Sequence, residues 1–159
     1  MRRLLVLTLL LLACTVPLGL AAGTPTDGTL SVKRGKGVIT LKVTGTIIGR
    51  VTNGRVQVRD FKPNDGNDPQ WSCKRHRISR QVSYCKGRNL GFRVQDGRFT
   101  VTVRGNGISI SAVGHGQVDV DGTGDTGVND GVMSLDDGTY QSLPDFLTTY
   151  YLGPPPPGN

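Results

Sequence analysis

The sequence contains no glutamate, and all 12 of its acidic residues are aspartate. Beyond residue 22 it has a single alanine, Ala112. Because Glu and Ala are among the strongest helix formers, their near absence excludes a fold rich in helices. Val, Thr and Ile are frequent instead, and β-branched residues favour strands. A chain of 159 residues is expected to form one compact domain.

Residues 1–22 have the pattern of a secretory signal peptide. Two arginines follow the initiator Met, an apolar run spans Leu4–Leu12, and small residues close the segment. The apolar run is shorter than the roughly 20 residues of a membrane helix, so we expect no membrane span in the mature chain. Cys14 leaves an alternative open, because the residues before it resemble a bacterial lipobox. The predicted location is secreted or extracytoplasmic, with a lipid anchor at the membrane surface as the alternative.

Only Cys73 and Cys85 remain once the leader is set aside. In an oxidising compartment, two such thiols are expected to form one disulfide. The bridge would close a loop of about a dozen residues. A metal site that combines the two cysteines with His76 is the alternative, but the sequence offers no clear fourth ligand.

The chain shows an internal repeat at an offset of 62 residues. Leu30–Asp60 then overlays Phe92–Gly122 with nine identical pairs, among them Gly45 with Gly107. Each copy, at about 30–60 and 92–122, predicts a meander of four short strands. Asn-Gly at residues 53–54 and Asp-Gly at 96–97 are typical of two-residue hairpin turns.

Alternation along the predicted strands separates an apolar face from a polar one. Ile39, Leu41 and Val43 alternate with polar neighbours, and the run Phe99, Val101, Val103 repeats the pattern. The sequence therefore predicts an all-β fold: an antiparallel β-sandwich or closed barrel of about 8–10 short strands from a duplicated meander. A β-solenoid is the alternative. The single domain is expected to span 23–152, with a loop at 62–72 and a Pro-rich tail at 153–159.

Charge is divided between the two halves of the chain. Residues 28–89 hold 14 Lys and Arg against three Asp, whereas residues 90–151 hold three Arg against eight Asp. The densest basic segment, about 73–88, is called the basic loop; its cationic residues are Lys74, Arg75, Arg77, Arg80, Lys86 and Arg88. Trp71 and Tyr84 flank its densest part, residues 73–80. Such a segment suits an anionic polymer of a cell envelope, and we expect no nucleic acid partner. A solvated surface balanced by the acidic half is the alternative.

A segment near the C-terminus resembles the calcium loop of EF-hands, because oxygen-bearing side chains recur with a central Gly. Its candidate ligands are Asp119, Asp121, Thr123, Asp125 and Asp130. The expected strands flanking this loop exclude a helical EF-hand. Calcium is therefore the one cofactor that the sequence suggests, and a strand followed by a Gly- and Asp-rich turn is the alternative.

Catalysis has little support in the sequence. His76 and His115 are the only histidines, and neither lies in a nucleophile elbow or a metal-hydrolase motif. We therefore expect no catalytic residues and a non-enzymatic binding or structural role. A calcium-stabilised secreted module and a hydrolase are the two alternatives.

The leader, the Gly-punctuated strands and the run Gly107–Gly116 resemble small secreted all-β proteins of high-GC Gram-positive bacteria. The resemblance spans about residues 28–152. It implies an all-β, secreted protein and no particular activity.

Overall fold

The computed structural model describes residues 27–123 and 129–155, and this part of the chain is all-β with no helix. The predicted leader, including Cys14, and the predicted ligand Asp125 lie outside it. Seven strands form one antiparallel sheet: β1 (Gly28–Asp60), β2 (Gln70–Trp71), β3 (His76–Arg77), β4 (Val82–Asp121), β5 (Val132–Leu135), β6 (Gln141–Ser142) and β7 (Thr148–Leu152). No helix in the described ranges is long and apolar enough to cross a membrane.

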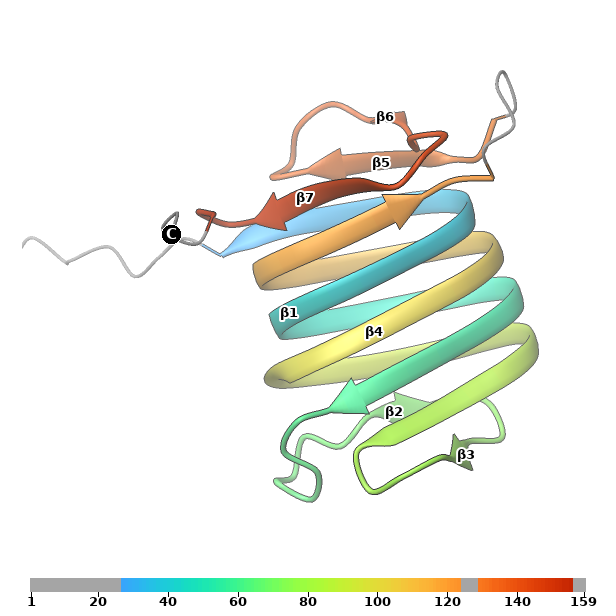
Figure 1. Cartoon of the computed structure of the whole chain (residues 1–159), viewed down its shortest axis with the longest axis vertical. Helices are drawn as coiled ribbons and strands as arrows, with labels where there is room; N and C mark the ends of the chain where they lie inside the picture. The colour runs from blue at the N-terminus through green and yellow to red at the C-terminus, as the bar shows by residue number, and fades with distance from the viewer. Residues whose placement is uncertain (1–26, 124–128, 156–159) are drawn as a thin grey trace, which may run out of the picture.

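The two long strands wind around each other as a flattened spiral (Figure 1). Residues of β1 pair on both sides with β4: Ile39 lies opposite Val103 on one side and opposite Val120 on the other. Those two partners are 17 residues apart in β4, which sets the length of one turn. The opposite faces of the spiral pack against each other as the layers of a sandwich do, and the sheet does not close into a barrel.

Columns of glycine mark the corners where the spiral turns. One column runs through Gly87, Gly54, Gly105 and Gly37, and another through Gly97, Gly45, Gly114 and Gly28, each residue paired with the next. Within β1 these glycines are spaced by eight or nine residues, which is half a turn. A φ of +148° at Gly45 is one that a residue with a Cβ rarely adopts, so glycine lets the strand bend without ending.

The core fills the interior of the spiral. The predicted apolar faces are confirmed: Ile39, Leu41 and Val43 are fully buried, as are Val101 and Val103. Phe99 packs beside them with 2% of its surface exposed. Alternation determines this result, because successive side chains of a strand point to opposite faces.

The predicted hairpins are wrong, although the all-β antiparallel prediction is confirmed. β1 pairs with β4 and β5 rather than with itself, so Asn53–Gly54 is a corner within one continuous strand. Asp96–Gly97 is a corner of β4 in the same way. A glycine with positive φ is suited both to a corner within a strand and to a hairpin turn. The two differ only in whether the strand then pairs with a distant strand or with its own preceding part.

The predicted repeat stays a prediction, but its strands do not form separate meanders. The offset of 62 aligns Gly45 with Gly107, whereas in the sheet Gly45 pairs with Gly97 and Gly114. Outside the two long strands, the predicted strand Val132–Leu135 is β5 as expected. Short strands cover the two ends of the spiral, with β5, β6 and β7 at one end and β2 and β3 at the other (Figure 1).

Candidate anion-binding surface

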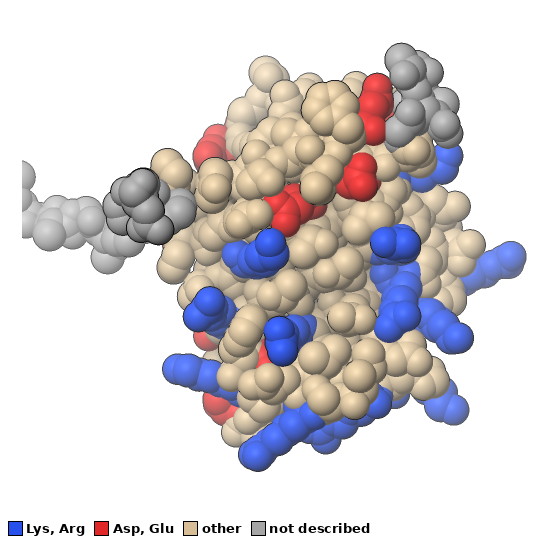
Figure 2. All heavy atoms as spheres, viewed as in Figure 1, with Lys and Arg blue, Asp and Glu red and all other residues tan. Residues whose placement is uncertain are grey.

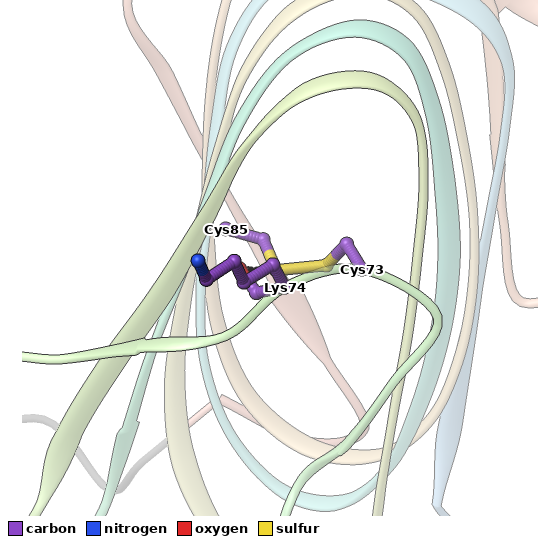
Figure 3. Close-up of a disulfide and its surroundings, with 3 residues drawn as sticks. All are labelled: Cys73, Lys74 and Cys85. Carbon is purple, nitrogen blue, oxygen red and sulfur yellow. Dashed lines mark hydrogen bonds between the residues drawn. A yellow bond between two sulfur atoms is a disulfide. The ribbon is translucent and has the colours of Figure 1, made fainter.

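The basic loop is fastened to the end of the spiral by a disulfide. The predicted Cys73–Cys85 bond is present, with the two Cα atoms 6.3 Å apart. Cys85 is fully buried within β4, whereas Cys73 lies half-buried in the segment after β2 (Figure 3). The Cys85 Sγ also lies 3.2 Å from the carbonyl oxygen of Lys74. The bond therefore fixes the backbone at the start of the basic loop beside the buried Cys85, while the Lys74 side chain stays exposed.

The six predicted basic residues are exposed, but they lie in different places. Arg77 donates hydrogen bonds from Nε and Nη2 to the carbonyls of Ser79 and Arg80, so it organises the loop. Lys86 pairs with Arg55 in the sheet, and Arg88 pairs with Asn53 at a corner. The six residues of the basic loop therefore form two groups, one at residues 74–80 and one at Lys86 and Arg88 of β4.

A small polar cavity of about 70 Å³ lies under the loop. Its charged lining residues are Asp60, Asp68, Arg75, Arg77 and Arg80. Asp60 is only 6% exposed; its Oδ1 accepts the Lys62 N–H at 2.8 Å, and its Oδ2 has no hydrogen-bond partner in the described chain. Burial raises the pKa of this carboxyl group, the Lys62 N–H opposes the shift, and two neighbouring aspartates add to it. Among the described residues no ion pair joins Asp60 to these arginines, so their charge is not neutralised there by a direct contact.

The front face of the spiral continues the basic surface away from the loop. This front face, which Figures 1 and 2 show toward the viewer, is formed by residues 38–44, 55–61, 82–86, 98–104 and 115–121, with β7. Arg55 lies between two other cations of this face, opposite Lys86 on one side and Arg104 on the other. All three side chains are exposed. Like charges directly opposite each other in a sheet destabilise it, so this arrangement is a cost to folding.

Few acidic groups balance these cations. Within residues 27–123 and 129–155 the ion pair is Lys42–Asp119, and His115 Nδ1 lies 3.4 Å from Asp27 Oδ1; neither contact involves the Lys86–Arg55–Arg104 group. Basic side chains are spread over the middle and lower part of the front face, whereas most of the acidic ones in this view lie above them near the end of β4, with a few at the lower left edge (Figure 2). Away from the end of β4, this face is therefore mainly basic.

Aromatic rings hold several of the arginines in place. The Arg55 guanidinium lies 4.2 Å from the centre of the Tyr84 ring, and His76 stacks on the same tyrosine at 5.1 Å. Arg98 and Arg59 lie over Phe61, at 4.9 and 5.6 Å from its centre. Cation–π contacts of this kind restrict the side chains while leaving their charge available.

The predicted calcium ligands do not gather in the described part of the chain. Asp119 Oδ2 lies 3.2 Å from Lys42 Nζ, and its Oδ1 accepts hydrogen bonds from Gln117 and Thr149. Burial raises the pKa of Asp119, but these hydrogen bonds and Lys42 outweigh it, so the pKa lies below its ordinary value.

Of the other candidate calcium ligands in the described ranges, Thr123 and Asp130 contact each other. Asp130 is buried, and its Oδ2 accepts two hydrogen bonds from Thr123, which chiefly lower its pKa. Asp121 ends β4 and is half-buried. The described ranges contain no group of three or more His, Cys, Asp or Glu side chains suited to a metal. Because Asp125 lies outside them, calcium binding stays a prediction.

The cations of the front face, notably Arg55, Arg98 and Arg104, were not among the residues predicted from the sequence. A signal was available, because Phe99, Val101 and Val103 point inward and therefore turn residues 98, 100, 102 and 104 outward. The neighbours of these residues come from strands distant in the sequence, and the pairing register alone brings them together.

Comparison with known proteins gives no further guide to this surface. No protein-family model, curated protein or solved structure matches the chain.

Proposed function

We propose that this chain is an extracytoplasmic, non-enzymatic β-domain that binds anionic polymers of a cell envelope, with the basic loop as a contact. The observation that carries the proposal is the cation group Lys86–Arg55–Arg104, which begins at Lys86 of the basic loop and takes part in no ion pair of the described chain. A sheet that keeps three like charges side by side loses stability unless a ligand neutralises them. An anionic polymer neutralises several at once.

The loop supports this proposal through its rigidity. Its base is fixed by the disulfide and by the hydrogen bonds of Arg77. A surface that is ordered before binding loses less conformational entropy when a polymer docks. Lys74, Arg75 and Arg80 are exposed on this fixed loop.

Salt-dependent binding tests the proposal. Retention of the protein on an immobilised polyanion is expected to weaken steeply as salt rises, because counterions compete for each contact. The triple variant Lys74→Ala, Arg75→Ala, Arg80→Ala should elute at clearly lower salt. It leaves Arg77 in place, so that the loop keeps its internal hydrogen bonds.

A matched control removes the same charge elsewhere. Lys33, Arg50 and Arg93 are exposed and lie on the opposite face of the spiral. In the sheet Lys33 pairs with β5, Arg50 pairs with Gly91 of β4, and Arg93 pairs with β2. Their triple substitution by Ala lowers the net charge equally and should change retention much less. Equal losses in the two variants would show that only net charge matters, and retention that ignores salt would contradict the proposal.

A further inference from the structure

On the front face, the pairing register aligns the residues of neighbouring strands in columns that run across the sheet. One column contains no charge: it runs through Tyr84, Gln57, Thr102 and Thr40, each residue paired with the next. The Thr40 and Thr102 hydroxyls lie 3.3 Å apart, and both side chains are half-buried. Neighbouring strands are about 4.8 Å apart, so this neutral column offers a hydrogen-bonding group at each such step.

Cations border the neutral column on both sides. On one side lies the column Lys86, Arg55 and Arg104. On the other side lies Arg59, and beyond it Arg98, held over Phe61. Columns on one face are about 7 Å apart, because every second residue of a strand points the same way.

Arg55 links the cationic border to the neutral column. Its Nη2 donates a hydrogen bond to Gln57 Oε1 at 3.1 Å, and its guanidinium lies over Tyr84. The charge is therefore turned toward the neutral column. At the far end of this column Thr40 pairs with Asp119, and this carboxylate takes part in the ion pair with Lys42. An anionic chain would meet repulsion at that point, so the usable track lies over residues 55–59, 82–86 and 98–104 and ends at Thr40.

We propose, on the basis of the function proposed above, that the front face binds an acidic polysaccharide lying along the neutral column. The guanidinium groups bind carboxylate or sulfate groups, for which their planar donors are suited. The threonine hydroxyls and the Gln57 amide bind sugar hydroxyls, which need both donors and acceptors. A polyphosphate has no such hydroxyls and would use the cations alone.

The experiment measures the affinity of the full chain for four soluble polymers at fixed, low salt. Polygalacturonate carries carboxylates, dextran sulfate carries sulfates, inorganic polyphosphate carries no sugar, and dextran carries no charge. Tight binding of one or both acidic polysaccharides is expected, and their ranking identifies which acidic group the arginines prefer. Dextran should not bind.

Two front-face variants separate the contributions of charge and hydroxyl groups. Arg55→Gln with Arg104→Gln should weaken polysaccharide binding roughly tenfold or more, since two charged contacts are lost. Thr40→Val with Thr102→Val keeps the side-chain shape and removes both hydroxyls. It should weaken polysaccharide binding about three- to tenfold and leave polyphosphate binding unchanged. Thr44→Val, elsewhere on the same face, is the control.

The possible failures are distinguishable. If the loop variant loses binding while the arginine pair variant does not, the front face is not the contact, and the proposed function then depends on the basic loop alone. If the threonine variant weakens polyphosphate equally, or leaves the polysaccharides unaffected, the hydroxyl groups have no role and the polysaccharide assignment is wrong. If the unaltered protein binds none of the three polyanions, both proposals fail.

Discussion

Gly54 and Gly105 lie directly opposite each other at a corner of the spiral. The backbone at each of them lies where a Cβ on the other would have to be. A Cβ on Gly54 would lie 2.1 Å from the carbonyl oxygen of Arg104, and a Cβ on Gly105 would lie 2.2 Å from that of Asn53. The contact is reciprocal because the strands are antiparallel and both bend at the same height. The spiral can turn here only if both residues are glycine.

Gly54→Ala is therefore expected to destabilise the protein by about 3 kcal/mol or more, since both the backbone conformation and the carbonyl contact become unfavourable. Denaturant unfolding measures the loss. Gly66→Ala is the matched control, because Gly66 also has a positive φ, of +94°, but nothing lies within 4 Å of its Cβ position. If the two variants lose the same stability, close packing at the corner is not the cause.

Arg104→Gln is expected to raise the free energy of unfolding by roughly 0.2–1 kcal/mol while it weakens polyanion binding, because Arg104 lies opposite Arg55. Arg93→Gln is the control: Arg93 pairs with Ile48 and Gln70, so no cross-strand repulsion is relieved. Urea unfolding at low salt measures the free energy of unfolding of both variants. A loss of stability in Arg104→Gln would show that the like-charge group does not strain the sheet.

Reduction of the Cys73–Cys85 bond is expected to cost about 3 kcal/mol, the entropy of a loop with a sequence separation of 12. The reduced protein should also bind polyanions less tightly, because the basic loop is no longer fixed at its base. Unfolding with and without a reductant measures the first effect. The variant Cys73→Ala with Cys85→Ala should show no response to the reductant, and a response there would implicate another thiol.

Asp119 should make the protein sensitive to acid. Its pKa in the folded protein lies below the ordinary 3.8, so its contribution is present above that pH and is lost as the pH falls through the folded value. Asp119→Asn is expected to lower stability by about 1 kcal/mol at neutral pH and to flatten the loss below about pH 4. Stability measured from pH 2 to 7 tests this.

Asp60 is the control, because its pKa is shifted in the direction opposite to that of Asp119. Burial raises its pKa, so protonation of this group favours the folded state as the pH falls. Asp60→Asn should therefore make the acid loss steeper rather than flatter. If both variants change the acid profile in the same direction, the assigned pKa shifts are wrong.

Calcium is the remaining prediction from the sequence. If the segment 119–130 binds calcium, millimolar calcium should raise the melting temperature, and Asp119→Ala with Asp121→Ala should abolish the rise. Magnesium at the same concentration is the control for a general ionic effect. An unchanged melting temperature would exclude a calcium-stabilised module.

The sequence by itself determined the all-β class, the inward faces of the strands and the disulfide. These features depend on local properties: missing helix formers, alternation along a strand, and two cysteines a dozen residues apart. It also located the basic loop, since charge density along the chain is visible without a structure. For Ile39, Leu41 and Val43 the prediction was complete, because a period of two is enough to assign a face.

The tertiary structure decided how the strands pair, and with it the front face. The same Gly54 suits a hairpin turn or a corner, and the choice depends on whether β1 pairs with itself or with β4, some 50 residues away. That pairing places Arg55 between Lys86 and Arg104. No local pattern contains this information, because the free energy that selects the register comes from burying the apolar residues of both strands in one core.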